Sequence, residues 1–317
     1  MENDWIRPPL LNAWYLSGPT AAGKTDVGMC LAEILNAEII SLDSMAVYRG
    51  MDIGTAKPSW EQRQRVPHHL IDIVDPTECF SVSQYVKMAH ETVQEISARG
   101  KVALFVGGTP LYLRTLIRGM FLGPEADWDF RKQVKQDVAE FGAESLRERL
   151  RQVDPVLAHK LLPGDLRRTI RALEVARITG KPLSHWQSHF ERPQPQEACR
   201  VFVLGWERPV IHQRVNERVE RMYAQGLIEE VKHLLDHYRD LGRTASQAVG
   251  YRETMEYLDG KHSLEETIRL VQAHTRQFVR RQEIWFRSTP EVRRIPMESG
   301  YSPETIAEQI ASVIGSA

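Results

Sequence analysis

The stretch Gly18–Thr25, which reads Gly-Pro-Thr-Ala-Ala-Gly-Lys-Thr, constrains this chain more than any other segment. It has the spacing G-x-x-x-x-G-K-[ST] of a phosphate-binding loop. Residues 12–17 before it are predicted to form a short buried strand, and residues 26–35 after it carry apolar side chains on one helical face. A loop between a strand and a helix turns successive backbone N–H groups, and the positive end of the helix, toward one point. The sequence therefore predicts a phosphate site, without indicating which phosphate ester binds there.

Two side chains of this loop extend the predicted site. Lys24 supplies a cation for the outer phosphate, and the hydroxyl of Thr25 is suited to binding Mg²⁺. We therefore assign phosphate binding to the whole loop, which consists of Gly18, Pro19, Thr20, Ala21, Ala22, Gly23, Lys24 and Thr25.

Strands and helices alternate through the first third of the chain. After the first helix, strands are predicted at residues 38–42, 69–74 and 102–106. A helix between the last two begins with the capping box Ser81–Gln84 and ends near Gly100. Such alternation is typical of an α/β fold, here a P-loop NTPase-like, doubly wound parallel sheet.

From about residue 121 the pattern changes to helices without strands. These helices are predicted at residues 131–141, 143–152 and 166–179. Strand character returns at residues 199–204, and helices follow at residues 211–225, 228–238 and 264–287. We therefore expect the first part of the core at residues 1–120, a helical insertion domain at residues 121–197, and completion of the core with carboxyl-terminal helices at residues 198–317.

The composition narrows the class of protein. No apolar run approaches the roughly 20 residues needed to cross a bilayer, and the first residues are acidic, so we expect an unexported, cytoplasmic protein without membrane contact. Cys30, Cys79 and Cys199 lie far apart without zinc-site spacing, which indicates reduced thiols. A net charge of −1 taken alone argues against a nucleic-acid partner. Arginines nevertheless cluster at residues 167–171 and 276–287, and local patches matter more than the sum.

Two polar residues follow predicted strands, at the sheet edge where ligands bind in open parallel sheets. Asp43 suits three roles: a catalytic carboxylate, a helper for Mg²⁺, or a helix cap. Thr109 comes after Gly107–Gly108. Its hydroxyl could donate a hydrogen bond to a phosphate, orient a nucleophile, or cap the next helix.

Other candidate residues have structural alternatives. His68 and His69 are adjacent and would point to opposite faces of a strand, so we interpret them as structural. Arg167, Arg168 and Arg171 are neighbours on a predicted helix, where they form either a phosphate-binding set or a solvated basic face. On the last long helix Leu264, Ile268, Val271, Phe278 and Trp285 form a predicted core stripe. Trp285 and Phe286 are interpreted as core aromatics, with base stacking as the alternative.

Several stretches together resemble one family, the tRNA dimethylallyltransferases of the isopentenyl-transferase group. These stretches are residues 18–25, 43–58, 66–72, 107–112, 165–174, 247–252 and 275–282, together with Trp285. The resemblance runs from about residue 11 to residue 287. The loop at residues 18–25 is shared with many unrelated enzymes, whereas the string from Asp43 to Pro58 is highly specific.

The resemblance implies a prenyl transfer from dimethylallyl diphosphate to N6 of the adenosine immediately 3′ of a tRNA anticodon. Asp43 would accept a proton from the adenine amino group as that group attacks C1 of the donor. Thr109, Arg218, Lys24 and Thr25 would stabilise the departing diphosphate together with Mg²⁺, with Arg214 as the alternative to Arg218. The base must be flipped out of the anticodon loop to reach them. The resemblance also implies a monomeric cytoplasmic enzyme.

The resemblance further implies contacts with the anticodon stem-loop, with the helical insertion closing over one side. The residues concerned are Asp43, Ser44, Met45, Arg131, Arg167, Arg168, Thr169, Ile170, Arg171, Gln247, Ala248, Val249, Gly250, Tyr251, Arg252, Arg280, Arg281, Gln282, Trp285 and Arg287. Two positions depart from the family pattern. Ala46 stands where many members carry a longer residue, which puts one base or phosphate contact in doubt. Pro110 follows Thr109 where glycine or another residue is usual, and it fits the first turn of the next helix.

Two other functions fit parts of the sequence. An ATP-dependent kinase of a small metabolite fits the phosphate-binding loop alone, and it would consume ATP and ignore tRNA. A nucleotide-gated RNA-binding switch is the second alternative, but the sequence contains no N-K-x-D guanine signature.

Overall fold

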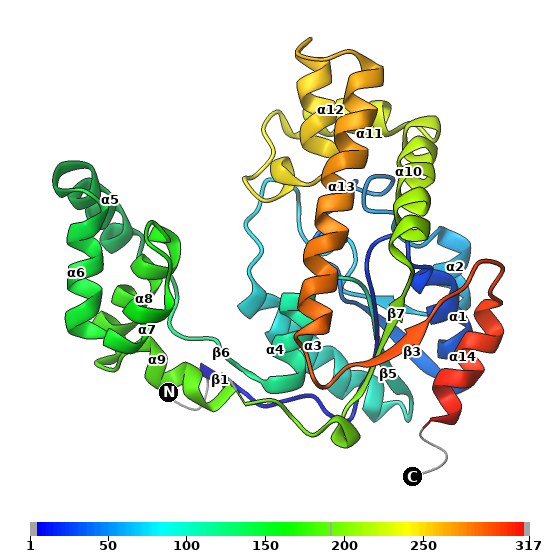
Figure 1. The fold of residues 1–317 in the computed structure, drawn as a ribbon, viewed down its shortest axis with the longest axis horizontal. Helices are drawn as coiled ribbons and strands as arrows, with labels where there is room; N and C mark the ends of the chain where they lie inside the picture. Colours follow the sequence, from blue (N-terminus) through cyan, green and yellow to red (C-terminus); the bar gives the residue numbers. More distant parts are fainter. Residues whose placement is uncertain (1–4, 191, 314–317) are drawn as a thin grey trace. The chain divides into compact units, whose positions relative to one another are not determined.

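The computed structural model describes residues 5–190 and 192–313 (Figure 1). Within this part of the chain, Leu10–Ile117 and residues 194–313 form a larger compact unit. Residues 5–9 and Arg118–Pro193 form a smaller one.

A six-stranded parallel sheet forms the centre of the larger unit (Figure 1). Its strands, in the order β4-β3-β5-β2-β7-β8, are β4 (His68–His69), β3 (Ala37–Ser41), β5 (Val102–Val106), β2 (Trp14–Ser17), β7 (Arg200–Gly205) and β8 (Arg293–Pro296). Each neighbouring pair is parallel. The strand order reverses at β2, and ligands bind outside the carboxyl ends of the strands at such a point. The predicted doubly wound parallel sheet is confirmed.

Helices cover both faces of this sheet. On one face α1 (Lys24–Leu35) packs against α14 (Pro303–Ser312), and both contribute to a core with Leu16 of β2 (Figure 1). Tyr15 points to the opposite face, because side chains alternate along a strand, and it stacks on Phe105 at a ring-centroid distance of 4.9 Å. On that face α3 (Val82–Ala98) begins at the predicted capping box, and its Tyr85 stacks on Tyr112 of α4 (Pro110–Arg118).

A second group of helices surrounds the segment that follows β3. Its members are α10 (Arg208–Ala224), α11 (Leu227–Tyr238), α12 (Tyr251–Leu258) and α13 (Leu264–Arg287), whereas the short helix α2 (Trp60–Arg65) is itself part of the chain between β3 and β4. Tyr48 and Met51 of that segment share a buried core with Leu227 and Tyr251. The buried side chains of the segment after β3 therefore pack against these helices. Among the described residues, none of these helices combines the length and apolarity that crossing a bilayer requires.

The strand predicted at residues 69–74 is wrong beyond His69. Leu70 and Asp72 have φ angles of 59° and 56°, which interrupt an extended backbone. The Asp72 N–H instead donates to the Ala46 carbonyl at 3.1 Å. A pairing between two loops has replaced the strand, and hydrophobic periodicity does not reveal such pairings.

The smaller unit is a helical bundle with a short antiparallel ribbon. Its elements are β1 (Ile6–Arg7), β6 (Met120–Phe121), α5 (Trp128–Phe141), α6 (Ala143–Val153), α7 (Pro155–Lys160), α8 (Leu166–Thr179) and α9 (Leu183–Gln187). The prediction that residues 5–9 belong to the α/β core domain is corrected, because they are part of the smaller unit. The ring of Trp5 lies edge-on to those of Phe121 and Trp186, at ring-centroid distances of 6.3 and 6.2 Å. Leu146, Leu150 and Ala172 complete the core of this unit.

Candidate phosphate-binding active site

The phosphate-binding loop lies between β2 and α1 and has the backbone that its sequence demands. Gly18 has a φ angle of 147°, and a Cβ there would come within 2.9 Å of the Leu204 carbonyl oxygen. Gly23 is the N-cap of α1 with a φ angle of 91°, and no side chain caps the helix. The N–H groups of the first helical turn are thus left for a ligand, at the positive end of the helix dipole.

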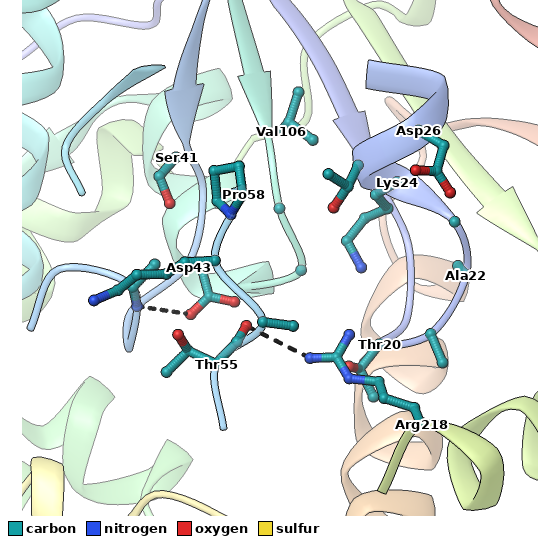
Figure 2. A pocket seen from close by; sticks show the side chains of 18 of the residues that line it. Thr20, Ala22, Lys24, Asp26, Ser41, Asp43, Thr55, Pro58, Val106 and Arg218 are labelled. Carbon is teal, nitrogen blue, oxygen red and sulfur yellow. Dashed lines mark hydrogen bonds between the residues drawn. The ribbon is translucent and has the colours of Figure 1, made fainter. Parts of the chain in front are cut away.

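This loop forms one wall of a cavity of about 350 Å³ (Figure 2). The other walls come from distant parts of the chain and are formed by Asp43, residues 55–58, Gly107, Gly108, Arg218 and Gln282, among others. In Figure 2, Lys24, Asp43, Thr55 and Arg218 surround one space. The loop and the strand-end carboxylate, which the sequence placed only at the same sheet edge, therefore line the same cavity.

Among the described residues, several cations that line the cavity have no carboxylate partner, and two of them, Lys24 and Arg218, interact electrostatically with Asp43. In the described part of the chain, neither Lys24 nor Arg218 lies within ion-pair distance of an acidic side chain, and Lys24 Nζ donates to the Pro19 carbonyl at 2.7 Å. Burial lowers the pKa of Lys24 to about 7, with a further contribution from Arg218. Burial also lowers the pKa of Arg218, while the Asp43 carboxylate opposes that shift. An anion in this cavity would stabilise both charges.

Asp43 is held in place through one carboxylate oxygen. Its Oδ1 accepts from the backbone N–H groups of Met45 at 2.8 Å and Ala46 at 3.4 Å. The carboxylate lies on the cavity wall that faces the phosphate-binding loop. Asp43 thus bonds the backbone of its own loop and also lines the cavity, which leaves its catalytic role a prediction.

Part of the cavity is apolar. Ile39, Ala46, Ile71, Val106 and Phe278 contribute to its lining. Ala46 is 5% exposed, so the departure from the family pattern lies at the cavity rather than on a surface. Apolar walls beside phosphate-binding groups suit a ligand that carries a hydrocarbon chain on a phosphate.

Arg214 lines the same cavity and also supports the loop. Its Nε donates to the Ala21 carbonyl at 2.8 Å, and its guanidinium lies 4.4 Å from the ring centroid of Trp206. Trp206 in turn donates to the Ala22 carbonyl at 3.0 Å, and Tyr301 lies edge-on to Trp206. Since the guanidinium of Arg214 is engaged by the loop's own backbone, Arg218 is the better placed of the two arginines for a ligand in the cavity.

Two predicted residues have other partners than expected. Thr109 Oγ1 accepts from the Ser44 N–H at 3.1 Å, so its hydroxyl fixes the segment next to Asp43 rather than lining the cavity. Gln282 was assigned to tRNA, but it is 2% exposed. Its Oε1 accepts from the Thr20 N–H at 3.1 Å and its Nε2 donates to the Gly108 carbonyl at 2.5 Å. Gln282 thus bridges the phosphate-binding loop and the end of β5, while Pro110 begins α4 as predicted.

The arginines predicted on the helical unit divide into two groups. Arg131 and Arg171 both donate to Glu174, a fully buried carboxylate, at distances down to 2.7 and 2.5 Å. Arg167 and Arg168 are exposed on α8, and Arg168 makes only a surface pair with Asp165 at 3.0 Å. Thr169 and Ile170, from the same predicted set, are buried. Arg167 and Arg168 are therefore more accessible to a large anionic partner than Arg131 and Arg171, which are partly buried and engaged by Glu174.

The other predicted tRNA residues lie on the larger unit and are also divided. Ala248, Gly250 and Tyr251 are buried, which corrects the expectation that the Tyr251 side chain contacts RNA. Trp285 is half-buried with the guanidinium of Arg114 5.7 Å from its ring centroid, whereas Phe286 is a core residue. The exposed or half-buried members are Asp43, Ser44, Met45, Gln247, Val249, Arg252, Arg280, Arg281 and Arg287.

The predicted core stripe of α13 is partly wrong. Leu264 and Phe278 are each 38% exposed, whereas Val271 is buried as predicted, and Thr267 and Gln282 are buried in addition. His69 Nε2 lies 2.7 Å from Glu38, and the His68 ring bonds the Val66 carbonyl while His68 also lines the cavity, so the structural interpretation of the two residues stays a prediction. No cluster of three or more metal-ligating side chains occurs among residues 5–190 and 192–313.

The fold and this cavity define a class of protein, a P-loop α/β protein with a catalytic-type carboxylate facing the loop. The IPP transferase family matches residues 46–289, and the chain belongs to that family. It is 49% identical to the tRNA dimethylallyltransferase of Rhodopirellula baltica, with 91% of this chain and 89% of that protein covered. It is 42% identical to the tRNA dimethylallyltransferase of Pelotomaculum thermopropionicum, with 98% of each chain covered.

Solved structures of the same family have the same fold. The tRNA isopentenylpyrophosphate transferase of Bacillus halodurans matches with a TM-score of 0.70 at 39% identity, with 96% of each chain covered. A eukaryotic dimethylallyltransferase acting on tRNA matches with a TM-score of 0.79 at 26% identity, with 96% of this chain and 78% of that one covered. The resemblance noted in the sequence is therefore confirmed.

Proposed function

We propose that this chain transfers the dimethylallyl group of dimethylallyl diphosphate to N6 of the adenosine 3′-adjacent to the anticodon of tRNAs and releases diphosphate. The observation that carries the proposal is the composition of one cavity. It contains a phosphate-binding loop, an apolar wall, a carboxylate, and cations, Lys24 and Arg218 among them, that have no acidic partner in the described part of the chain. Its relatives are tRNA dimethylallyltransferases, which does not favour the alternative of a small-molecule kinase.

In this proposal the phosphate-binding loop receives the diphosphate of the donor. The loop amides and Lys24 bind its oxygens, and Arg218 stabilises the negative charge that develops as the bond to C1 breaks. The apolar lining that includes Ile71 and Val106 receives the five-carbon chain. Such fixed cations lower the barrier because they favour the departing diphosphate over the intact donor.

Asp43 takes the proton. With Oδ1 held by two backbone N–H groups, the carboxylate keeps one orientation while the amino group of the flipped adenine attacks C1. The new N6–C1 bond forms as the C1–O bond to diphosphate breaks, and the proton of the amino group passes to Asp43. Positioned proton transfer of this kind typically contributes about 10²- to 10⁴-fold. Thr109 acts one step away, by fixing Ser44 beside this carboxylate.

Mg²⁺ would be bound in the cavity mainly through oxygens of the donor diphosphate, rather than by a full set of protein ligands. The Thr25 hydroxyl is exposed at the first turn of α1, beside the loop, and is a suitable oxygen ligand. Bound there, Mg²⁺ would neutralise charge on the diphosphate. The absence of a cluster of acidic ligands among the described residues is consistent with an ion that keeps waters and phosphate oxygens as its other ligands.

We further propose that the exposed basic residues contact the anticodon stem-loop and that the enzyme is a monomer. Arg167, Arg168, Arg280, Arg281 and Arg287 supply the cations for phosphates. Extrusion of the adenine costs a few kcal/mol, which these contacts offset.

The proposal is tested with labelled dimethylallyl diphosphate and total tRNA, followed by nucleoside analysis. We expect label in an N6-modified adenosine and release of diphosphate, with no dependence on ATP. Label that stays in the donor, or ATP consumption without tRNA, would contradict the proposal.

A further inference from the structure

A single carboxylate fastens the segment that leads into the cavity wall. Glu230 of α11 accepts from the backbone N–H groups of Asp52 at 3.0 Å, Ile53 at 2.7 Å and Gly54 at 3.4 Å. Its Oε1 also accepts from the hydroxyl of Tyr251 at 2.6 Å. Three consecutive N–H groups directed at one anion form a strong and specific attachment, because each donor bonds a charged acceptor.

Tyr251 holds the same segment by its shape. Its side chain is fully buried, and a Cβ on Gly54 would overlap its ring. Burial and the neighbouring Glu230 carboxylate raise the pKa of Tyr251 well above its ordinary value, so the hydroxyl stays protonated and donates. Tyr251 therefore fixes Gly54 through van der Waals contact and Glu230 through a hydrogen bond.

The fastened segment continues directly into the donor cavity. Thr55, Ala56, Lys57 and Pro58 line that cavity, immediately after Gly54. The Thr55 carbonyl accepts from Arg218 at 3.5 Å. A shift of residues 52–54 would thus move a cavity wall and the partner of a cation in it.

We propose that Tyr251 and Glu230 are positioning residues, which set the wall of the donor cavity at residues 55–58 and the orientation of Arg218. The inference rests on the proposed function and deepens it, since Tyr251 lies in the stretch 247–252 that the resemblance assigned to tRNA. The Tyr251 side chain is fully buried and does not line the cavity. It links the acceptor-binding stretch to the donor cavity, and binding effects that pass through such a link are reciprocal.

The test compares two tyrosine hydroxyls of the same helical cluster. Tyr251→Phe removes the hydrogen bond to Glu230 and keeps the ring against Gly54. The matched control is Tyr223→Phe, which removes a 3.0 Å hydrogen bond between Tyr223 and Thr254. For Tyr251→Phe we expect KM for dimethylallyl diphosphate to rise about 5- to 20-fold, from the loss of one hydrogen bond to a charged group, with kcat within about threefold. Tyr223→Phe should leave that KM unchanged.

A second measurement separates the failure of this inference from that of the proposed function. Calorimetric binding of inorganic diphosphate is expected to weaken in Tyr251→Phe and further in Glu230→Gln, whose amide cannot accept at both positions. Equal diphosphate affinity and equal donor KM in Tyr251→Phe and the wild type, with only melting temperature lowered, would overturn the positioning role. A wild type that binds diphosphate without modifying tRNA would overturn the proposed function instead, and the diphosphate affinities of the variants would still decide the inference.

Discussion

The two units of this chain use their cations in opposite ways. In the helical unit Arg131 and Arg171 both bond the buried carboxylate of Glu174. In the larger unit Lys24 and Arg218 face a cavity and have no acidic partner among the described residues. A charge withdrawn from water is costly unless it is paired. The first arrangement is completed within the protein and stabilises it, whereas the second is completed only by an anionic ligand.

The largest effect that follows from this comparison is expected at Asp43, the carboxylate opposite the unpaired cations. Asp43→Asn keeps the acceptor oxygen for the Met45 N–H but removes the base, so kcat should fall about 10²- to 10⁴-fold. Affinity for tRNA should change little. Single-turnover rates and a tRNA binding titration measure the two effects separately.

The control for this variant is Asp236→Asn, which removes an exposed carboxylate from α11. We expect its kcat to stay within about twofold of the wild type, since surface changes of this kind rarely matter. Wild-type turnover in Asp43→Asn would remove that residue from the mechanism.

The next effect concerns the unpaired cations themselves. Lys24→Ala should weaken the binding of dimethylallyl diphosphate about 10- to 100-fold, as expected for a lost hydrogen bond to a charged group. Arg171→Ala, on the paired side of the comparison, should leave donor affinity unchanged. Calorimetric titration of the donor distinguishes them, and unchanged donor binding by Lys24→Ala would refute the role of the loop.

Removing the partner of the paired cations is expected to lower the stability of the protein instead of its donor affinity. Glu174→Gln leaves two guanidinium groups with a neutral partner, and we expect the free energy of unfolding to fall by about 2 kcal/mol. A fully buried pair typically loses roughly 3–5 kcal/mol, but Arg131 and Arg171 keep 27% of their side chains exposed. Denaturant titration measures the loss. A change in donor KM without a change in the free energy of unfolding would show instead that Glu174 serves donor binding and not stability.

The sequence revealed the strand-end residues and the phosphate-binding loop, because both depend on local order along the chain. The ion pair of Arg171 with Glu174 could also have been predicted from the sequence, because the two residues have the i, i+3 spacing of a helical ion pair. Gln282 gave no such signal, because its partner Thr20 lies 262 positions away. The burial of Tyr251 likewise depends on a tertiary contact with Gly54. Periodicity predicts which face of an element is buried, but not which distant backbone group lies beneath it.

The pKa of Lys24 predicts a pH dependence of donor binding. In the free protein Lys24 loses its proton as the pH rises through about 7. A bound diphosphate favours the ammonium form, so binding above pH 7 takes up a proton, and affinity falls by at most about tenfold per pH unit. Below that pH the Lys24 contribution is constant.

Calorimetry in buffers of different ionisation enthalpy counts these protons directly. Lys24→Met should abolish the uptake at pH 8, and the paired-side variant Arg171→Met should retain it. Proton uptake that persists in Lys24→Met would assign it to another group.

The smallest expected effect is on the salt dependence of tRNA binding, which should differ between variants of exposed arginines and variants of paired ones. Arg167→Ala together with Arg168→Ala should reduce the slope of log K against log salt by about 1.5, because each phosphate contact contributes roughly 0.7 to 0.9. The pair of Arg168 with Asp165 does not prevent this, since 73% of the Arg168 side chain is exposed and such surface pairs are weak. Arg171→Ala should leave the slope unchanged and lower stability, since its guanidinium bonds Glu174.

A double variant with the same loss of charge provides the control for this slope. Arg65→Ala with Arg99→Ala removes two surface arginines of the larger unit, which pair with Glu33 and Glu38. If this control changed the slope as much as the α8 variant, net charge alone would account for the effect. If only the α8 variant changes it, the exposed arginines of that helix bind phosphates, and the same residue type then serves structure at Arg171 and recognition one turn earlier, at Arg167 and Arg168.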